Sequence, residues 1–165
     1  MNKETKIINW IKEYSNTSNL KTLVIGISGG IDSALTSTLC AETGINTIVV
    51  SMPIHQHPEQ LDRAYNHINW LQEKYKNVQY GEFNLSHIYD IFAMLFVDNQ
   101  SELALANSRA RLRMTTLYQI AQTNNGLVIG TGNKVEDFGV GFFTKYGDGG
   151  VDISPIADLM KSEVR

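Results

Sequence analysis

Residues 23–33 read LVIGISGGIDS, and the fold class can be predicted from this segment. The apolar run 23–27 predicts a short strand buried on both faces. It leads through Ser28-Gly29-Gly30-Ile31-Asp32-Ser33 into a helix expected at 34–43, which Gly44 ends. A strand that turns through adjacent glycines into a helix favours an α/β protein with a ligand loop beyond the strand.

The rest of the chain repeats the alternation of strands and helices. Further strands are expected at 47–51, 78–85 and 127–130, and helices near the N-terminus, after Pro58, at 88–96 and at 102–122. We therefore expect a single domain over residues 1–165 with an α/β fold. Its mostly parallel, doubly wound sheet would carry helices on both faces in three layers. A new helix is expected to begin near Lys161.

The amino-acid composition limits the classes of function that the protein could have. The 165 residues are 42% hydrophobic and 19% charged, with a net charge of −3, so no basic excess favours nucleic-acid binding. No apolar run reaches the ~20 residues that span a bilayer, and we expect no membrane partner. Cys40 is the single cysteine; it excludes an intrachain disulfide, suits the cytoplasm and is expected to be a core residue rather than a nucleophile.

The glycine loop predicts phosphate binding. Backbone N–H groups at a helix N-terminus hold anions, and glycines let the chain approach them closely. Ser28 and Ser33 can add hydroxyl donors, whereas Asp32 would repel a triphosphate unless Mg²⁺ bridges the two. The alternative is a Gly-Gly turn with a capping Asp or Ser, but the whole hexapeptide favours phosphate. The loop is neither a Walker A loop nor a dinucleotide fingerprint.

The hexapeptide resembles the SGGxDS loop of the ATP-pyrophosphatase superfamily, whose fold is called adenine nucleotide alpha hydrolase-like. Two later tracts narrow the resemblance: IGTGNKVE at 129–136 and GFFTKYGDGGVD at 141–152, with Lys161 downstream. Together they closely resemble ammonia-dependent NAD⁺ synthetases over most of residues 23–165. Family members usually continue well past the helix near Lys161, so we expect the chain to lack the C-terminal part of the family.

The resemblance implies a ligase that forms a C–N bond. ATP, as co-substrate with Mg²⁺, adenylates the carboxylate of deamido-NAD⁺; ammonia then attacks to give NAD⁺ and AMP. The family is also a homodimer that binds deamido-NAD⁺ at its interface. Two alternatives stay open: another ATP-pyrophosphatase, such as a GMP synthetase-like or tRNA-modifying enzyme, or a non-catalytic fragment that binds adenine nucleotides.

The resemblance also assigns roles to individual residues. The Mg²⁺ ligands would be Asp32 and Glu136, and the catalytic residues Asp32, Glu136, Lys161 and Asp148. The ATP contacts would be Gly26, Ile27, Ser28, Gly29, Gly30, Ile31, Asp32, Ser33, Thr131 and Lys161. The deamido-NAD⁺ contacts would be Arg111, Lys145, Asp148 and Asp152. From the residues alone, Asp32 and Glu136 follow different strand ends and could flank one hard cation. Each of these assignments has a simpler structural alternative: Glu136 could be a solvated loop acid, Lys161 an ordinary surface lysine, and Asp148 a residue that only forms a turn.

The long helix and the loop 51–58 give weaker indications. Helical geometry places Arg111 and Asn107 on one side, where we expect a substrate anion. Arg109 and Arg113 fall on the other side and are expected to make salt bridges or a subunit contact. The run His55-Gln56-His57 is poor evidence for a metal site. In the family this loop covers the adenine, so Gln56 is a candidate contact.

Overall fold

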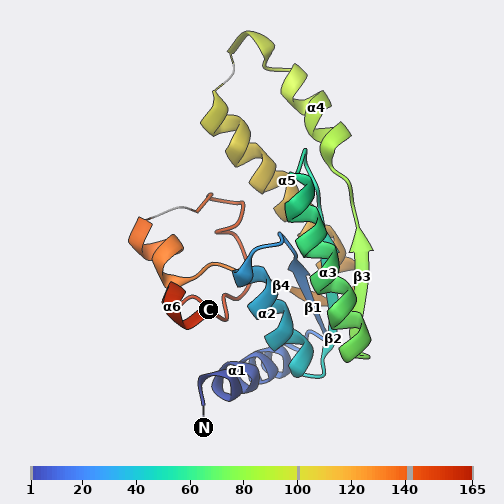
Figure 1. The fold of residues 1–165 in the computed structure, drawn as a ribbon, viewed down its shortest axis with the longest axis vertical. Helices are drawn as coiled ribbons and strands as arrows, with labels where there is room; N and C mark the ends of the chain where they lie inside the picture. Colours follow the sequence, from blue (N-terminus) through green and yellow to red (C-terminus); the bar gives the residue numbers. More distant parts are fainter. Residues whose placement is uncertain (1, 100, 141–142, 165) are drawn as a thin grey trace.

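The centre of the molecule is a parallel β-sheet (Figure 1). The computed structural model describes residues 2–99, 101–140 and 143–164. Within these ranges the strands are β1 (Thr22–Gly26), β2 (Asn46–Ser51), β3 (Val78–Glu82) and β4 (Gly126–Ile129), in the order β3-β2-β1-β4. Every pairing is parallel, as the alternation of strands and helices predicted.

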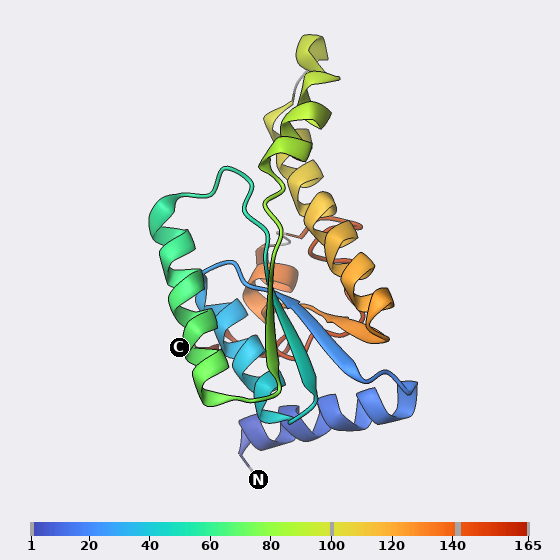
Figure 2. The same ribbon diagram turned by 90° about the vertical axis from the view of Figure 1, so that its right-hand side faces the viewer.

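Helices cover both faces of the sheet (Figure 2). One face packs against α1 (Lys3–Ser18), α2 (Ile31–Glu42) and α3 (Pro58–Lys74), and the other against α5 (Glu102–Thr123); Tyr89 of α4 (Ser86–Met94) joins the core on the α5 side. This confirms the three-layer, doubly wound arrangement. The chain moves outward from β1 to β3 and then returns to place β4 beside β1. The loops after β1 and β4 therefore diverge, which opens a crevice at the carboxyl ends of these two strands.

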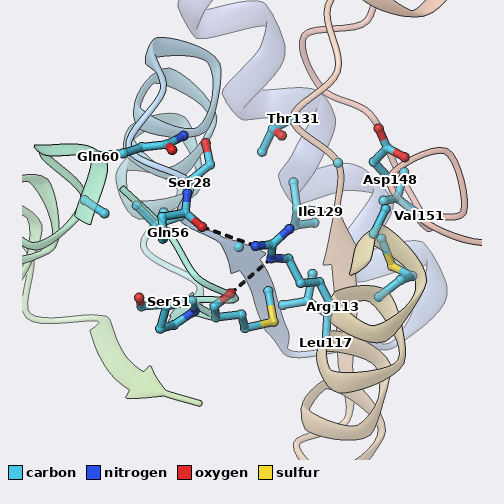
Figure 3. A pocket seen from close by; sticks show the side chains of 18 of the residues that line it. Ser28, Ser51, Gln56, Gln60, Arg113, Leu117, Ile129, Thr131, Asp148 and Val151 are labelled. Atoms are coloured by element: carbon cyan, nitrogen blue, oxygen red, sulfur yellow. Dashed lines mark hydrogen bonds between the residues drawn. The ribbon is translucent and has the colours of Figure 1, made fainter. Parts of the chain in front are cut away.

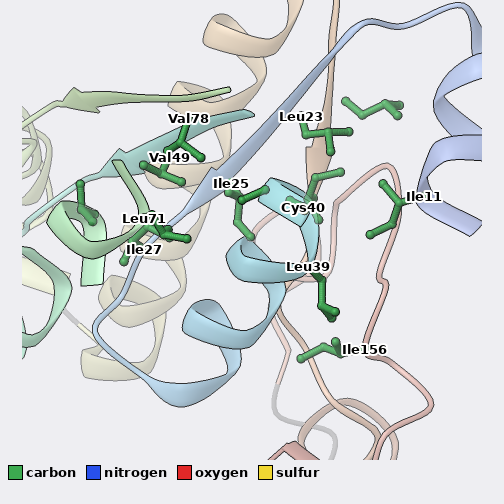
Figure 4. Close-up of a cluster of buried hydrophobic side chains, with 14 of the residues drawn as sticks. Ile11, Leu23, Ile25, Ile27, Leu39, Cys40, Val49, Leu71, Val78 and Ile156 are labelled. Atoms are coloured by element: carbon green, nitrogen blue, oxygen red, sulfur yellow. The ribbon is translucent and has the colours of Figure 1, made fainter. Parts of the chain in front are cut away.

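Strand β1 is buried on both faces, as its apolar run predicted. Leu23 and Ile25 join the core beneath α1–α3 (Figure 4), whereas Val24 joins the core beneath α5. All three side chains are fully buried. Burying aliphatic side chains of this size stabilises a fold by about 1.5–3 kcal/mol each, so the strand that carries the glycine loop is firmly anchored.

Local signals in the sequence fix most element ends. Gly44 follows α2 with φ +75°, and Pro58 occupies the first turn of α3. Ser101 caps α5 by accepting a hydrogen bond from the Ala104 N–H. The third strand ends at Glu82, earlier than expected. The π-helical turn η2 (Val135–Val140) was not predicted, and α6 (Lys161–Val164) begins where the last helix was expected.

The N-terminal part of α5 extends beyond the sheet together with α4 and the short helix η1 (Val97–Asn99) (Figures 1 and 2). We call this projection the arm. The predicted apolar stripe of α5 is buried only where the sheet lies beneath it, at Met114, Leu117 and Ala121, whereas Leu103 is 70% exposed. None of the described helices combines the length and hydropathy that a transmembrane span requires.

Candidate active site

A pocket opens at the carboxyl ends of the strands, where the topology places it (Figure 3). It is a cavity of about 330 Å³ between the loops after β1, β2 and β4 and the side of α5. Five of the predicted site residues line it: Gly26, Ile27, Ser28, Thr131 and Asp148. The predicted ATP and substrate tracts, which lie more than 100 residues apart, therefore meet at one cavity.

The glycine loop is shaped by its own side chains and by α3. Gly29 has φ +81°, and a Cβ there would lie 2.2 Å from the backbone oxygen of Gln60. Gly30 is extended and caps α2. The Ser33 hydroxyl accepts from the Ser28 N–H and donates to the Gly30 carbonyl. Because Ser33 is buried, it shapes the loop, while the first-turn N–H groups of α2 stay oriented for an anion.

Lys161 joins the two predicted metal ligands. Its ammonium group lies 2.5 Å from Asp32 Oδ2 and 2.8 Å from Glu136 Oε1. Asp32 lies in the first turn of α2, Glu136 belongs to η2 and Lys161 starts α6. The hydrogen bonds to Asp32, and then to Glu136, raise the Lys161 pKa above its usual value. As expected, Asp32 and Glu136 lie close together, and both contact one cation, the ammonium group of Lys161.

The geometry of this cluster fits Mg²⁺. Two carboxylates that both reach one ammonium nitrogen can also reach one small cation, and hard oxygen ligands are those Mg²⁺ prefers. Among the described residues no group of three or more His, Cys, Asp or Glu side chains is placed to hold a metal. A Mg²⁺ ion held by Asp32 and Glu136 would complete its coordination with phosphate oxygens and water, as Mg²⁺ usually does at nucleotide sites.

Sequence reasoning missed Arg113. Its side chain extends from α5 into the pocket, where Nε donates to the Met52 carbonyl at 3.0 Å and Nη2 to Gln56 Oε1 at 3.2 Å (Figure 3). Both acceptors are uncharged oxygens inside the cavity, so the expected salt bridge of Arg113 is absent among the described residues, whereas its expected subunit contact stays a prediction. Burial, and then the nearby Arg109, lower the Arg113 pKa. Arg109 itself lies over the Tyr89 ring, 5.5 Å from its centroid.

The predicted side of α5 holds the loop that follows η2. Arg111 Nε donates to the Lys145 carbonyl at 3.1 Å, and Asn107 Oδ1 accepts from the Thr144 hydroxyl at 2.9 Å. Asp148 turns the same loop by accepting from the Thr144 N–H at 2.7 Å. Arg111 and Asn107 therefore face the substrate tract. Whether Arg111 contacts a substrate anion stays a prediction.

Lys145 and Asp152 occupy different surroundings. The Lys145 ammonium lies 5.0 Å from the Tyr146 ring centroid at an exposed position. Asp152 accepts from the Tyr118 hydroxyl at 3.0 Å and from the Val128 N–H at 2.7 Å, and with burial this contact raises the Tyr118 pKa to about 12. Asp152 thus ties the substrate tract to β4 and α5. Its predicted substrate contact stays a prediction.

Two minor expectations can be compared with the structure. His55 Nε2 pairs with Asp90 Oδ1 at 2.7 Å, and His55 and His57 belong to no metal-binding group among the described residues. Cys40 is fully buried, and burial raises its pKa to about 12. Because Cys40 is fully buried, the prediction that it is a core residue is confirmed. A thiol with such a raised pKa stays protonated and unreactive at neutral pH.

The parallel sheet with its switch point, together with the fold of its structural relatives, defines an α/β protein of the adenine nucleotide alpha hydrolase-like class. The sequence profile described as NAD synthase matches residues 4–165. The NH₃-dependent NAD⁺ synthetase of Saccharolobus solfataricus is 43% identical over 96% of this chain, and that of Carboxydothermus hydrogenoformans 40% identical over 98%. The chain belongs to the NAD synthase family.

Solved structures agree. The NH₃-dependent NAD synthetase of Campylobacter jejuni superposes with a TM-score of 0.89 at 34% identity, covering 98% of this chain and 69% of that one. An NMN synthetase of Francisella tularensis gives a TM-score of 0.90 at 34% identity, covering 98% of this chain and 66% of that one. The chain spans 56% of the Saccharolobus relative and 66% of the Carboxydothermus relative.

Proposed function

We propose that this protein carries out the ATP- and Mg²⁺-dependent amidation of deamido-NAD⁺ with ammonia. The observation that carries the proposal is the convergence of Asp32 and Glu136 on one cation beside a cavity bordered by the glycine loop. Family membership supports the same reaction, since the curated relatives are NH₃-dependent NAD⁺ synthetases.

The proposed reaction has two steps. A carboxylate oxygen of deamido-NAD⁺ attacks the α-phosphorus of ATP, the bond to the β-phosphate breaks, and pyrophosphate leaves. Ammonia then attacks the carbon of the acyl-adenylate, AMP leaves with the bonding electron pair, and one proton is released. Adenylation is needed because a carboxylate oxygen is a poor leaving group, whereas AMP is a good one.

Different residues of the chain would bind the phosphates, neutralise their charge and border the acceptor. The N–H groups at the start of α2, with the Ser28 hydroxyl and Thr131, would hold the phosphates beside the cavity. A bound Mg²⁺ would supply charge neutralisation for the phosphate oxygens. Lys161 carries an ammonium that can follow the negative charge from the carboxylates to the phosphates, because its side chain is flexible. Asp148 would bound the cavity on the side of the acceptor.

The acceptor nucleotide is open to one specific alternative. The relative from Francisella tularensis is an NMN synthetase, which indicates that this scaffold also accommodates mononucleotide chemistry. The predicted acceptor-binding residues Arg111 and Lys145 lie on or beside the loop next to α5. A mononucleotide and a dinucleotide differ only in the part distant from the reacting carboxylate, so either could bring its carboxylate to the same place.

One assay tests the proposal and ranks the acceptors. The protein is incubated with ATP, Mg²⁺ and ammonium, and with either deamido-NAD⁺ or nicotinate mononucleotide, and AMP and the amide product are quantified. The proposal predicts AMP and NAD⁺ in equal amounts with deamido-NAD⁺ and a lower kcat/KM with the mononucleotide. A higher kcat/KM with the mononucleotide would favour the second acceptor. ATP binding without AMP release under either condition would contradict both.

We further propose that the protein acts as a cytoplasmic homodimer. The described part of the arm carries eight exposed large apolar side chains that a monomer would leave in water: Ile88, Ile91, Phe92, Met94, Leu95, Phe96, Val97 and Leu103. A second copy that presents the same surface would bury them in a two-fold interface. The single, buried cysteine suits a reducing compartment.

A further inference from the structure

Asn133 is a polar side chain that lies between the two proposed metal ligands. Its side chain is fully buried, with 0% exposure. Nδ2 donates to Asp32 Oδ1 at 2.8 Å. Oδ1 accepts from the N–H groups of Val135 at 3.0 Å and Glu136 at 3.2 Å. One amide therefore touches the carboxylate of one ligand and the backbone of the other.

The partners of Asn133 fix how its amide is oriented. An ionised carboxylate only accepts hydrogen bonds, so the NH₂ group must face Asp32. Backbone N–H groups only donate, so the carbonyl oxygen must face Val135 and Glu136. The amide cannot rotate by half a turn without losing all three hydrogen bonds, and in a buried position each loss would leave a polar group unpaired, which is unfavourable.

The two ends of the amide control different features of the site. The carbonyl end caps the turn that carries Glu136, since residues two and three positions after a cap are those it binds. The NH₂ end occupies Asp32 Oδ1, which leaves Oδ2 directed at the cation position that Lys161 Nζ holds in this structure. The cap and the bridge together set the position of each carboxylate relative to the other.

We propose that Asn133 is a positioning residue that presets Asp32 and Glu136 for a divalent cation bound with the nucleotide. The proposal rests on the proposed function only in taking these two carboxylates as the metal ligands. Groups that orient metal ligands commonly contribute about 10–100-fold to metal affinity. A merely structural role would require only the cap, and a serine supplies a cap of similar strength.

Asn133→Ser separates the two roles. Its hydroxyl can cap the turn but is too short to reach Asp32, so the fold should remain while the bridge is lost. Asn133→Ala removes both. Asn77→Ala is the matched control: Asn77 is a half-buried amide with two hydrogen bonds, to the Ala41 and Ile45 carbonyls at 2.9 and 2.8 Å, on the turn before β3, at the opposite end of the sheet.

The measurement is the affinity for α,β-methylene-ATP, which resists cleavage between the α- and β-phosphates, with Mn²⁺ and with EDTA. Mn²⁺ substitutes for Mg²⁺ and is followed by electron paramagnetic resonance. We expect the metal-dependent gain in affinity to fall about 10–100-fold in Asn133→Ser and Asn133→Ala. Affinity in EDTA should change less than about threefold in both, and Asn77→Ala should lower only the melting temperature.

Three results would overturn the inference. The metal-dependent gain could be the same in Asn133→Ser as in the wild type, affinity in EDTA could fall as much as affinity with Mn²⁺, or the wild-type protein could bind no Mn²⁺ beside the nucleotide. The measurement needs neither deamido-NAD⁺ nor ammonia. An Asn133-dependent Mn²⁺ site in a protein that forms no NAD⁺ would therefore contradict the proposed function and leave this inference standing.

Discussion

The position of Asp32 and two of its contacts explain its place in the proposed mechanism. It lies in the first turn of α2 beside the glycine loop, accepts from Asn133 through Oδ1 and contacts Lys161 through Oδ2. An acid so close to a phosphate-binding loop would weaken nucleotide binding unless a cation lay between them. The proposed mechanism therefore requires a negative charge at the position of Asp32 Oδ2.

The substitution Asp32→Asn tests that requirement. The amide would keep the size of the side chain but remove the charge, so stabilisation of the transferring phosphate should fall by about 3–4 kcal/mol, or roughly 10²–10³ in kcat. AMP formation at saturating substrates measures the effect. Glu13→Gln, an equivalent loss of charge at an exposed position on α1, should keep wild-type kcat. Unchanged AMP formation in Asp32→Asn would remove Asp32 from the mechanism.

Arg113 carries the second prediction at this scale. Its guanidinium fixes Gln56 and the Met52 carbonyl at the pocket wall. In Arg113→Met these oxygens lose their donor, and we expect the dissociation constant for ATP to rise about tenfold, the equivalent of about 1.4 kcal/mol. Equilibrium binding in EDTA measures it. Arg109→Met, outside the pocket lining, is the control; equal losses of affinity in the two variants would contradict the assignment.

Sequence patterns placed some of these residues and missed others for physical reasons. Asp32 and Glu136 were expected to converge because each follows the end of a different parallel strand. The helical geometry separated Arg111 from Arg113, but which side of α5 borders the pocket depends on how the helix lies on β1 and β4. Asn133 resembled an ordinary loop residue, because its role depends on a contact 101 positions away in the chain.

At the scale of elements, the turn from β1 into α2 controls the site. Gly29 has a left-handed backbone and lies directly against the backbone of α3. Gly44, after the same helix, shares the left-handed backbone with φ +75°, yet a Cβ there would meet nothing within 4 Å. The two positions share the requirement for positive φ and differ in the available space.

Alanine substitutions at these glycines separate the two effects. Gly44→Ala should lower the free energy of unfolding by about 1–2 kcal/mol through its left-handed backbone alone. Gly29→Ala should add a clash that moves the loop, giving a larger loss of stability and no measurable ATP binding. Urea unfolding and nucleotide titration measure the two quantities. Equal stabilities, with ATP binding retained in Gly29→Ala, would refute the close approach.

The elements themselves were largely predictable. Short apolar runs, together with the turn and cap signals at Gly44, at Pro58 and in the glycine loop, predicted the strands and helices, with small shifts at their ends. The turn η2 and the loop after it could not be predicted in the same way. Side-chain hydrogen bonds hold them: Asn133 accepts from the Glu136 N–H, and Asp148 accepts from the Thr144 N–H. Such contacts leave no periodic pattern in the sequence from which they could be predicted.

At the scale of the whole molecule, the arm is the feature that a monomer does not explain. Leu95 is 74% exposed and Met94 72% exposed on a projection that extends past the sheet. Such a surface favours association with a second copy. The sequence predicted an apolar stripe along α5 but gave no sign that its first turns would lack a sheet beneath them.

Leu95→Glu tests the homodimer. A charge buried twice in a two-fold interface should weaken association by about 3 kcal/mol, or roughly 100-fold, and sedimentation equilibrium measures the change. Trp10→Glu, at an exposed aromatic residue on α1 (43%) outside the arm, should leave the dimer intact. A wild-type protein that stays monomeric at high micromolar concentration would contradict the proposal.

In the proposed mechanism, a substrate carboxylate attacks the α-phosphorus of ATP held at the glycine loop. Deamido-NAD⁺ with ¹⁸O in both carboxylate oxygens tests it directly, with AMP and pyrophosphate examined by mass spectrometry after turnover with ammonia. Attack at the α-phosphorus should place one ¹⁸O atom in every AMP molecule formed and none in pyrophosphate. Unlabelled AMP, or label in a phosphate released from the γ position with ADP as product, would contradict it.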